Sequence, residues 1–280
     1  MHVNGTALVY TMQGRGTPVV FVHGSNSDHR LWEPQRAAVA RHFRYIAYDQ
    51  RYFGTARWPD SGTGFSPQAQ IDDLANLLGA LDSGPAHLVG WSMSADAILG
   101  VAMRHPGLVR SVFLHEPSLR GLALDPERDR RVRADFHSAI SPALAVLHGG
   151  DPAAAVRMFM DGVNDQAGSF DAMPDWLQRM AMDNARTLPL QFAAPPPPGI
   201  SCGDLHELDI PVAITCGEQT RACYRIVAGA ASQCLRHARL ITIPGARHLW
   251  PVQAPAAFNV ALLGFLRACQ PGRRRASPLK

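Results

Sequence analysis

Residues 87–98 read HLVGWSMSADAI. A short apolar run ends at Gly90, and a helix-compatible run of small and apolar residues begins at Met93. Ser92 lies between the two runs, with a small residue two positions away on each side. This pattern is typical of a tight strand-to-helix turn that pushes a serine hydroxyl out of the sheet edge. The first free N–H groups of the new helix favour negative charge there, which suits a nucleophile.

The motif departs from its usual form, G-x-S-x-G, because Ser94 stands where the second glycine is expected. Serine is small enough to fit, but a motif this short also occurs by chance. The alternative interpretation is a buried helix of small residues packed on a strand. The rest of the chain has to distinguish the two.

Composition indicates a globular protein. The chain has 280 residues, of which 46% are hydrophobic and 18% charged, so it forms one large domain or a core with an insertion. The net charge is +4 and the pI is near 9.0, with part of the basic excess at Arg273, Arg274, Arg275 and Lys280. Because no basic run lies on a predicted helix with interleaved aromatic residues, we expect no nucleic-acid partner.

The five cysteines are odd in number and form no C-x-x-C pair. This argues against a zinc site or a disulfide framework and for a reducing compartment. The N-terminus lacks an apolar signal segment, and no apolar run is long enough to span a bilayer. We therefore predict a cytoplasmic protein with no membrane partner. The oligomeric state is left open, with a homodimer as one alternative.

Apolar runs alternate with helical patterns. We predict strands over 18–22, 45–48, 86–89, 111–114, 211–216 and 239–243, and helices over 31–42, 66–81, 93–104, 221–237 and 255–268. Ser66 is the expected N-cap of its helix, with Pro67 in the first turn. The order predicts a mostly parallel central sheet with helices on both faces.

The alternation stops between residues 118 and 208, where helices are expected over 132–146, 152–160 and 174–187. Four consecutive prolines within 193–200 predict an extended spacer. The predicted organisation is a first core part over 1–117, an inserted helical cap over 118–208, a second core part over 209–268 and a basic tail over 269–280.

Side chains capable of chemistry follow the predicted strands directly. They are Ser92, Glu116, His248 and the His23-Gly24 turn. Since reactive groups in parallel sheets gather at the carboxyl ends of the strands, we expect these residues to lie close together.

With these pieces in this order, the chain resembles alpha/beta-hydrolases over nearly its whole length, the insertion matching only in position. The matching segments are 23–25, 49–51, 90–94, 116, 217–220 and 245–248. Most members of the family carry an aspartate where this chain has Thr220, and that aspartate orients the histidine. A threonine cannot hold the negative charge that stabilises an imidazolium. Either the triad is broken, or its acid lies elsewhere.

Glu116 is the expected replacement, with Glu218 as the competing acid. The haloalkane dehalogenases carry their acid after the same strand as Glu116, although they use an aspartate where this chain has Ser92. A closer similarity is to zearalenone-type lactone hydrolases, whose Ser-His-Glu triad has a glutamate that follows a histidine, as in His115-Glu116. That resemblance implies ester or lactone chemistry.

The expected roles follow from this resemblance and from the residue types. Ser92 is the nucleophile, and His248 is the general base and then the general acid, oriented by Glu116. The oxyanion is held by the backbone N–H of Met93 and by that of Ser25 or Gly24. We expect His23 to shape its turn, and Asp49 and Arg51 to form a structural ion pair.

The insertion is expected to supply the substrate pocket. Trp176 is a candidate wall for a ring substrate, and Asp96 binds polar groups either at its own helix or in the pocket. Adaptable apolar surface comes from Met158, Met160, Met173 and Met180. The sequence contains no P-loop, no G-x-G-x-x-G and no metal-ligand cluster, so no cofactor and no metal are expected.

The predicted function is a cofactor-free serine hydrolase that cleaves an ester or lactone of a mid-sized apolar substrate through an acyl-enzyme. Three alternatives remain open. The same triad could act on a carbon–carbon bond or a thioester. Thr220 and Ser94 would also suit a ligand receptor without catalysis. A cofactor-free oxygenase or ring-forming enzyme would need His248 but not Ser92.

Overall fold

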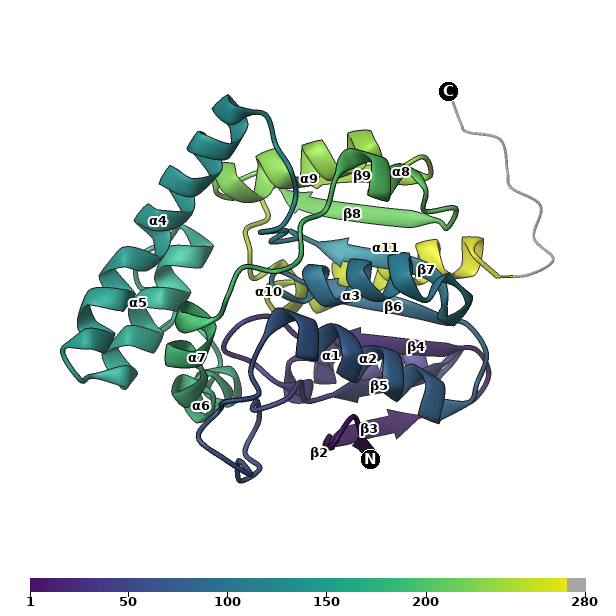
Figure 1. The fold of residues 1–280 in the computed structure, drawn as a ribbon, viewed down its shortest axis with the longest axis horizontal. Helices are drawn as coiled ribbons and strands as arrows, with labels where there is room; N and C mark the ends of the chain where they lie inside the picture. Colours follow the sequence, from purple (N-terminus) through teal and green to yellow (C-terminus); the bar gives the residue numbers. More distant parts are fainter. Residues whose placement is uncertain (271–280) are drawn as a thin grey trace.

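A seven-stranded sheet forms the centre of the computed structural model, which describes residues 1–270 (Figure 1). The strand order is β3-β5-β4-β6-β7-β8-β9, with β3 antiparallel to β5 and every other pair parallel. The strands are β3 (Tyr10–Gln13), β4 (Pro18–Val22), β5 (Arg44–Tyr48), β6 (Ala86–Trp91), β7 (Val109–His115), β8 (Val212–Gly217) and β9 (Ala238–Ile243). A short hairpin, β1 (His2–Val3) and β2 (Thr6–Ala7), precedes them. The predicted α/β fold and its six parallel strands are confirmed.

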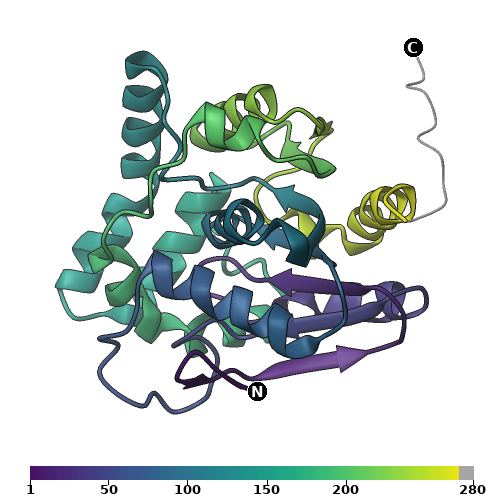
Figure 2. The same cartoon turned by 45° about the vertical axis from the view of Figure 1, so that its right-hand side comes forward.

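Helices cover both faces of the sheet, which is why its central strands are continuous apolar runs (Figures 1 and 2). One face carries α2 (Pro67–Leu81), α3 (Ser94–Arg104) and α9 (Ala222–Cys234), and the other carries α1 (Glu33–Ala40) and α11 (Pro255–Ala268). Alternate residues of β4 pack into the cores on opposite faces of the sheet. Val20 and Val22 belong to one core, and Val19 and Phe21 belong to the other. As predicted, Ser66 caps α2, its hydroxyl accepting from the Ala69 N–H.

Four further helices lie beyond the carboxyl ends of the strands, between β7 and β8 in the chain (Figure 1). They are α4 (Pro126–His148), α5 (Pro152–Asn164), α6 (Asp175–Asp183) and α7 (Leu188–Ala193). We call these four helices the cap helices. The connections into and out of them pair with each other, because Ile200 N–H donates to Gly121 O and Ala123 N–H donates to Ile200 O. The proline-rich segment after Ala193 is not helical, as its composition predicts.

A disulfide joins Cys202, in the short helix α8 (Cys202–His206), to Cys234 at the end of α9. The odd number of cysteines argued against a disulfide framework, yet two of the five cysteines are linked. The two cysteines are 32 residues apart, and only the packing of α8 on α9 brings their Cα atoms to 5.0 Å. No spacing pattern could reveal a single tertiary pair of this kind. The pair also removes the cysteine argument for a reducing compartment and for a cytoplasmic location.

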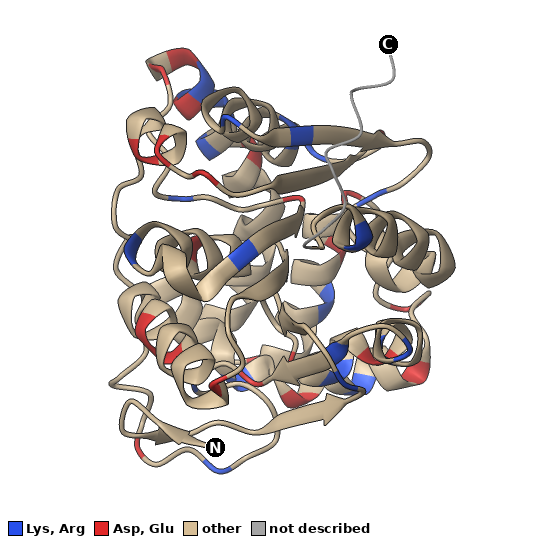
Figure 3. Cartoon of the chain, turned by 90° about the vertical axis from the view of Figure 1, so that its right-hand side faces the viewer, with Lys and Arg blue, Asp and Glu red and all other residues tan. Residues whose placement is uncertain are grey.

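Among residues 1–270, no helix is both long and apolar enough to cross a membrane. Basic and acidic residues are interspersed over the face drawn in Figure 3. The predicted basic tail, 269–280, lies outside the described residues from position 271 onward.

Candidate active site

Ser92 occupies a sharp turn between β6 and α3. Its backbone φ is +58°, in the left-handed region that few non-glycine residues adopt. The Ser92 N–H donates to His115 O on the neighbouring strand at 3.0 Å. The hydroxyl of Ser94 accepts from Trp91 N–H at 2.8 Å and donates to Trp91 O at 3.0 Å. The serine that replaces the usual glycine therefore closes the turn with its own hydroxyl.

Glu116 follows β7 and is completely buried. Its Oε1 accepts from the Gly217 N–H at 2.7 Å. Its Oε2 accepts from the Thr220 hydroxyl at 2.8 Å and faces His248 Nδ1 at 2.7 Å. Thr220, which stands where the family usually has its acid, thus donates to a carboxylate contributed by another strand. Glu218 is exposed, and its carboxylate accepts from the Gly245 N–H at 2.9 Å.

Three donors hold the Glu116 carboxyl in its ionised form. Burial alone would raise the pKa, but His115 and the hydrogen bonds from His248 and Gly217 lower the pKa of Glu116 to about 2. Burial also lowers the pKa of His115 to about 4, so that ring is neutral at pH 7. At pH 7, where His115 is uncharged, the hydrogen bonds from His248, Gly217 and Thr220 keep Glu116 anionic.

The His248 ring is buried between aromatic side chains. Tyr224, in the first turn of α9, stacks on it with ring centroids 4.2 Å apart and planes 8° apart. Trp91 contacts it with centroids 5.1 Å apart. Tyr224 lines the large cavity together with Ser92. Burial raises the pKa of Tyr224 well above its usual range, so the phenol stays protonated.

Ser92 and His248 line one small cavity together with Gly24 and Ser25. In the described part of the chain the two side chains form no direct hydrogen bond. A bond between nucleophile and base often tightens only when substrate binds.

The turn after β4 packs against the nucleophile. A Cβ added at Gly24 would lie 3.4 Å from Ser92 Cβ and 3.0 Å from Trp91 O. The N–H groups of Ser25 and Met93 donate to no residue within 1–270, so both are free to bind an oxyanion. His23 shapes the turn as expected, since its Nδ1–H donates to Gly24 O at 2.9 Å and its Nε2 accepts from Gln50 N–H at 3.0 Å.

A cavity of about 660 Å³ extends from Ser92 between the sheet and the cap helices. Its walls are mainly apolar, and the cap contributes Phe136, Ile140, Leu144, Leu147, Phe159 and Phe192. Trp176 is not among its lining residues; it packs half-buried against the apolar core that continues into the cap. The prediction that Trp176 forms a wall of the pocket is therefore wrong, and the aromatic lining that the cap contributes comes from phenylalanines of α4, α5 and α7. Of the four methionines, Met160 lines the small cavity at Ser92, Met173 and Met180 are buried in the apolar core, and Met158 is exposed.

Asp96 also lines this cavity, from the first turn of α3. The carboxyl is buried, and its Oδ1 has no hydrogen-bond partner within residues 1–270. Burial raises the pKa of Asp96 to about 7, against the opposing charge of Arg120 and the nearby N–H groups of Arg120 and Gly121.

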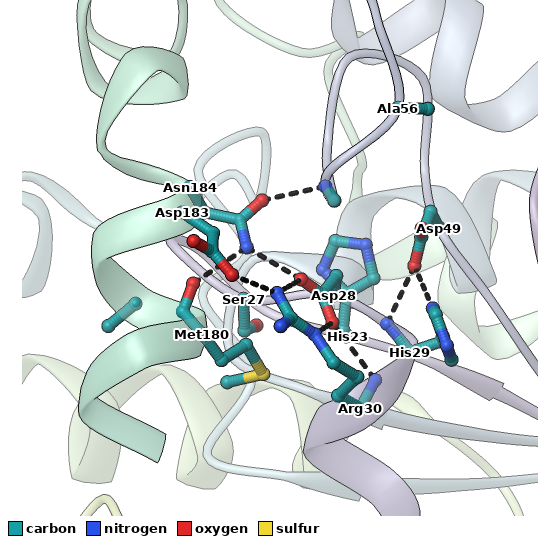
Figure 4. Close-up of polar contacts among 12 residues, drawn as sticks. His23, Ser27, Asp28, His29, Arg30, Asp49, Ala56, Met180, Asp183 and Asn184 are labelled. Carbon is teal, nitrogen blue, oxygen red and sulfur yellow. Dashed lines mark hydrogen bonds and ion pairs between the residues drawn. The ribbon is translucent and has the colours of Figure 1, made fainter. Parts of the chain in front are cut away.

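A polar network fastens the loop after β4 to helix α6 (Figure 4). Asp28 accepts from Arg30 and from the Asn184 amide at 2.8 Å, and Asn184 accepts from Gly54 N–H at 2.7 Å. Ligand atoms of Asp28, His29 and Asp49 lie within 4.8 Å of one another, as a metal site requires. The Asp28 carboxylate already pairs with Arg30 and accepts a hydrogen bond from Asn184, and the Asp49 carboxylate already pairs with His29. These partners balance the two carboxylates without a cation.

The expected ion pair between Asp49 and Arg51 is not formed. Asp49 pairs with His29, and Arg51 pairs with Asp73 on α2 at 2.7 Å. The chain turns sharply after β5, with φ of +71° at Tyr52, and Arg51 extends toward α2 instead of back toward Asp49.

Two contacts of the proposed triad were not predicted from the sequence. They are the stacking of Tyr224 on His248 and the hydrogen bond from Thr220 to Glu116. Both residues follow β8, and both reach the site only because the loop after β8 lies beside the ends of β6 and β7. A usable signal was present, since a helix that opens at the carboxyl edge presents its first turn to the site. The aromatic residue in that turn was therefore a candidate.

The family model described as the alpha/beta hydrolase family matches residues 19–261. Over 270 residues, the chain is 27% identical to the 2-(acetamidomethylene)succinate hydrolase of Mesorhizobium japonicum, covering 91% of this chain and 90% of that protein.

Two solved structures share the fold. The esterase RhEst1 of a Rhodococcus species superimposes with a TM-score of 0.79 at 24% identity, covering 96% of this chain and 97% of the other. A bromoperoxidase of Bacillus anthracis superimposes with a TM-score of 0.75 at 21% identity, covering 93% of this chain and 95% of the other. The match of the family model over most of the length shows that this chain belongs to the alpha/beta hydrolase family.

Proposed function

We propose that this protein is a serine hydrolase that cleaves an ester or lactone bond of a mid-sized apolar substrate. The single observation that carries the proposal is the 2.7 Å contact between His248 Nδ1 and the buried Glu116 carboxylate, beside a serine held in a strained turn. A carboxylate in that position fixes the imidazole and stabilises its protonated form. The mainly apolar cavity next to Ser92 supports an apolar substrate.

In the proposed reaction, Ser92 Oγ attacks the substrate carbonyl while His248 Nε2 takes the hydroxyl proton. The carbonyl oxygen becomes an oxyanion held by the N–H groups of Met93 and Ser25. The carbon–oxygen bond to the leaving alcohol breaks, and His248 gives its proton to that oxygen. Water then repeats the sequence on the acyl-enzyme, which releases the acid and restores Ser92. Loss of one oxyanion donor typically costs about 3–4 kcal/mol in enzymes of this type.

Tyr224 supports the base in this proposal. Its ring covers one face of the His248 imidazole at 4.2 Å and restricts rotation of that ring. Tyr224 also lines the large cavity together with Ser92, so it lies close to the proposed nucleophile.

The experiment that tests the function is a panel of p-nitrophenyl esters and lactones of different sizes, assayed with the parent and with Ser92→Ala. We expect turnover of apolar esters to fall at least about a thousandfold in the variant, because the nucleophile is lost. A Ser25→Ala variant keeps its backbone donor and should retain most activity. Equal rates for parent and Ser92→Ala on every active ester would contradict the proposal. Turnover of thioesters or carbon–carbon substrates alone would replace it with another reaction of the same triad.

A further inference from the structure

The last strand, β9, forms one edge of the central sheet (Figure 1). The other parallel strands are almost entirely buried, whereas every residue of β9 is half-buried or exposed. Leu240 and Ile241 are 44% and 38% exposed, on opposite faces of the sheet. An edge of this kind can pair with another strand, and proteins usually protect it with charges, prolines or bulges. β9 contains one charged residue, Arg239, no proline and no shift of register against β8.

The hydrogen bonds between β8 and β9 determine which peptide groups of β9 point outward. Glu218 N–H, directly after β8, donates to Ile243 O at 3.0 Å. Alternate residues of a strand bond to the same neighbour, so the odd-numbered residues of β9 face β8. The N–H and C=O groups of the even-numbered residues therefore point away from the sheet. These residues are Ala238, Leu240 and Thr242, and the last two donate to no residue within 1–270.

We propose that β9 pairs in antiparallel fashion with β9 of a second copy of this chain, about a two-fold axis at Leu240. This axis sets Leu240 opposite its own copy and Ala238 opposite Thr242, so all three outward-facing residues are paired. An axis one residue later, at Ile241, would set Ala238 opposite Pro244, which has no N–H. The backbone therefore favours one register, in which the two sheets join into one.

Charges at the ends of β9 support a second copy as the occupant of this edge. In the proposed register, the end of one β9 lies beside the start of the other. Glu218 is held at the end, where its exposed carboxylate accepts from Gly245 N–H at 2.9 Å. Arg236 precedes the start, and its guanidinium lies 3.5 Å from the exposed Glu207 carboxylate. The two-fold axis thus brings an acidic group of each copy toward a basic group of the other.

The dimer is expected to be weak. Pairing along one strand edge buries less than the about 1,600 Å² of a standard interface, so we expect a dissociation constant on the order of micromolar. Its apolar contribution comes from Leu240 and Ile241, whose exposed surfaces become covered. β9 supplies none of the three side chains of the proposed triad, so this inference is independent of the proposed reaction.

Sedimentation velocity of the full chain tests the dimer, and substitutions at Ile241 test its register. Ile241 faces Arg239 of the second copy, so Ile241→Lys opposes two like charges, whereas Ile241→Glu pairs opposite charges. We expect Ile241→Lys to weaken the dimer at least about tenfold and Ile241→Glu to keep it within about threefold. Both variants lose the same apolar side chain. Loss of the dimer in both, or in neither, would therefore overturn the inference.

The opposite edge of the sheet supplies the control. Met12→Lys places a charge on β3, where Met12 is 48% exposed, and should leave the dissociation constant unchanged. A dimer that only Met12→Lys disrupts would assign the contact to β3 and overturn the inference. A parent that stays monomeric up to about 100 µM would also overturn it, because another occupant must then cover β9.

Cysteine cross-linking tests the register independently. In a hydrogen-bonded antiparallel pair, opposite Cα atoms lie about 5.5 Å apart, which a disulfide can span. Leu240→Cys should therefore form a linked dimer on mild oxidation. Ile241→Cys should link much more slowly, because its two copies lie more than about 7 Å apart. The parent, whose free cysteines include Cys269, is the control. Faster linking of Ile241→Cys than of Leu240→Cys would overturn the inference, and if a charge variant fails to fold, this pair decides.

Discussion

Glu116 and Asp96 are both buried carboxyl groups within one site, yet their surroundings shift their pKa values in opposite directions. Glu116 receives three hydrogen bonds, and its pKa falls to about 2. Asp96 has an oxygen without a donor, and burial raises its pKa to about 7. Burial is similar in the two groups, so the supply of donors decides which charge state is favoured. The surroundings of Glu116 favour its anion, whereas Asp96 keeps one buried oxygen that has no donor within residues 1–270.

The largest effect is expected from Glu116→Gln. Glutamine keeps the size of the side chain but cannot stabilise an imidazolium, and the comparable change in a serine triad lowers kcat by about 10⁴-fold. Steady-state kinetics on the best ester should show a loss of that order. Glu218→Gln is the matched control, because Glu218 is exposed and should be replaceable with little effect. Loss of activity only in the second variant would make Glu218 the acid.

Asp96→Asn should stabilise the protein at alkaline pH. The pKa of Asp96 is raised on folding, so the folded state retains this proton more strongly and stability falls as pH rises from about 4 to about 7. Removing the ionisable group should increase the free energy of unfolding at pH 8 by on the order of 2 kcal/mol and change little at pH 4. Urea titrations at the two pH values measure this difference. An equal effect at both would show that Asp96 does not ionise in this range.

Glu116 should show the opposite pH dependence. Its pKa is lowered on folding, so its stabilising contribution is present above about pH 4.5 and is lost as the pH falls toward 2. The difference in stability between the parent and Glu116→Gln should therefore shrink on acidification. Urea titrations of the two proteins between pH 3 and pH 7 measure it, and a constant difference across that range would contradict the hydrogen-bonded anion.

Tyr224 stacks on His248, the histidine that pairs with Glu116. Tyr224→Leu removes the ring stacked on His248 and should lower kcat by up to about 100-fold, because a catalytic group displaced by about 1 Å can lose that much. Tyr224→Phe keeps the stack and should lose less. A pH–rate profile distinguishes positioning from structure, since a displaced imidazole shifts the limb assigned to His248. If the Phe variant is as slow as the Leu variant, the hydroxyl matters and the stacking does not.

The smallest effect is expected from Thr220→Val, which removes one of three donors to Glu116 while keeping the shape of the side chain. Loss of one hydrogen bond to a charged group costs about 1.5–3 kcal/mol. The two remaining donors should limit the effect on activity to roughly tenfold. Kinetics and thermal unfolding measured together check this. No change in either would mean that Thr220 is incidental to the acid.

The strands and helices of the core and the mostly parallel sheet could be predicted from the sequence, because buried parallel strands and helix caps leave local patterns. The turn at Ser92 and the strand before Glu116 were predicted in this way. The disulfide between Cys202 and Cys234, the stacking of Tyr224 on His248 and the partner of Arg51 were not. Each depends on segments brought together only by tertiary packing. Trp176 was misplaced for a related reason, since composition indicates an aromatic cap but not which helix face meets the cavity.

Covalent labelling of Ser92 tests the central claim most directly. The parent, Glu116→Gln and Glu218→Gln are treated with a fluorophosphonate, and the rate of adduct formation on the peptide containing Ser92 is followed by mass spectrometry. If Glu116 orients His248 and so activates Ser92, the parent and Glu218→Gln label at similar rates, while Glu116→Gln labels at least about a hundredfold more slowly. Equal labelling of all three proteins, or no adduct on Ser92 in the parent, would contradict it.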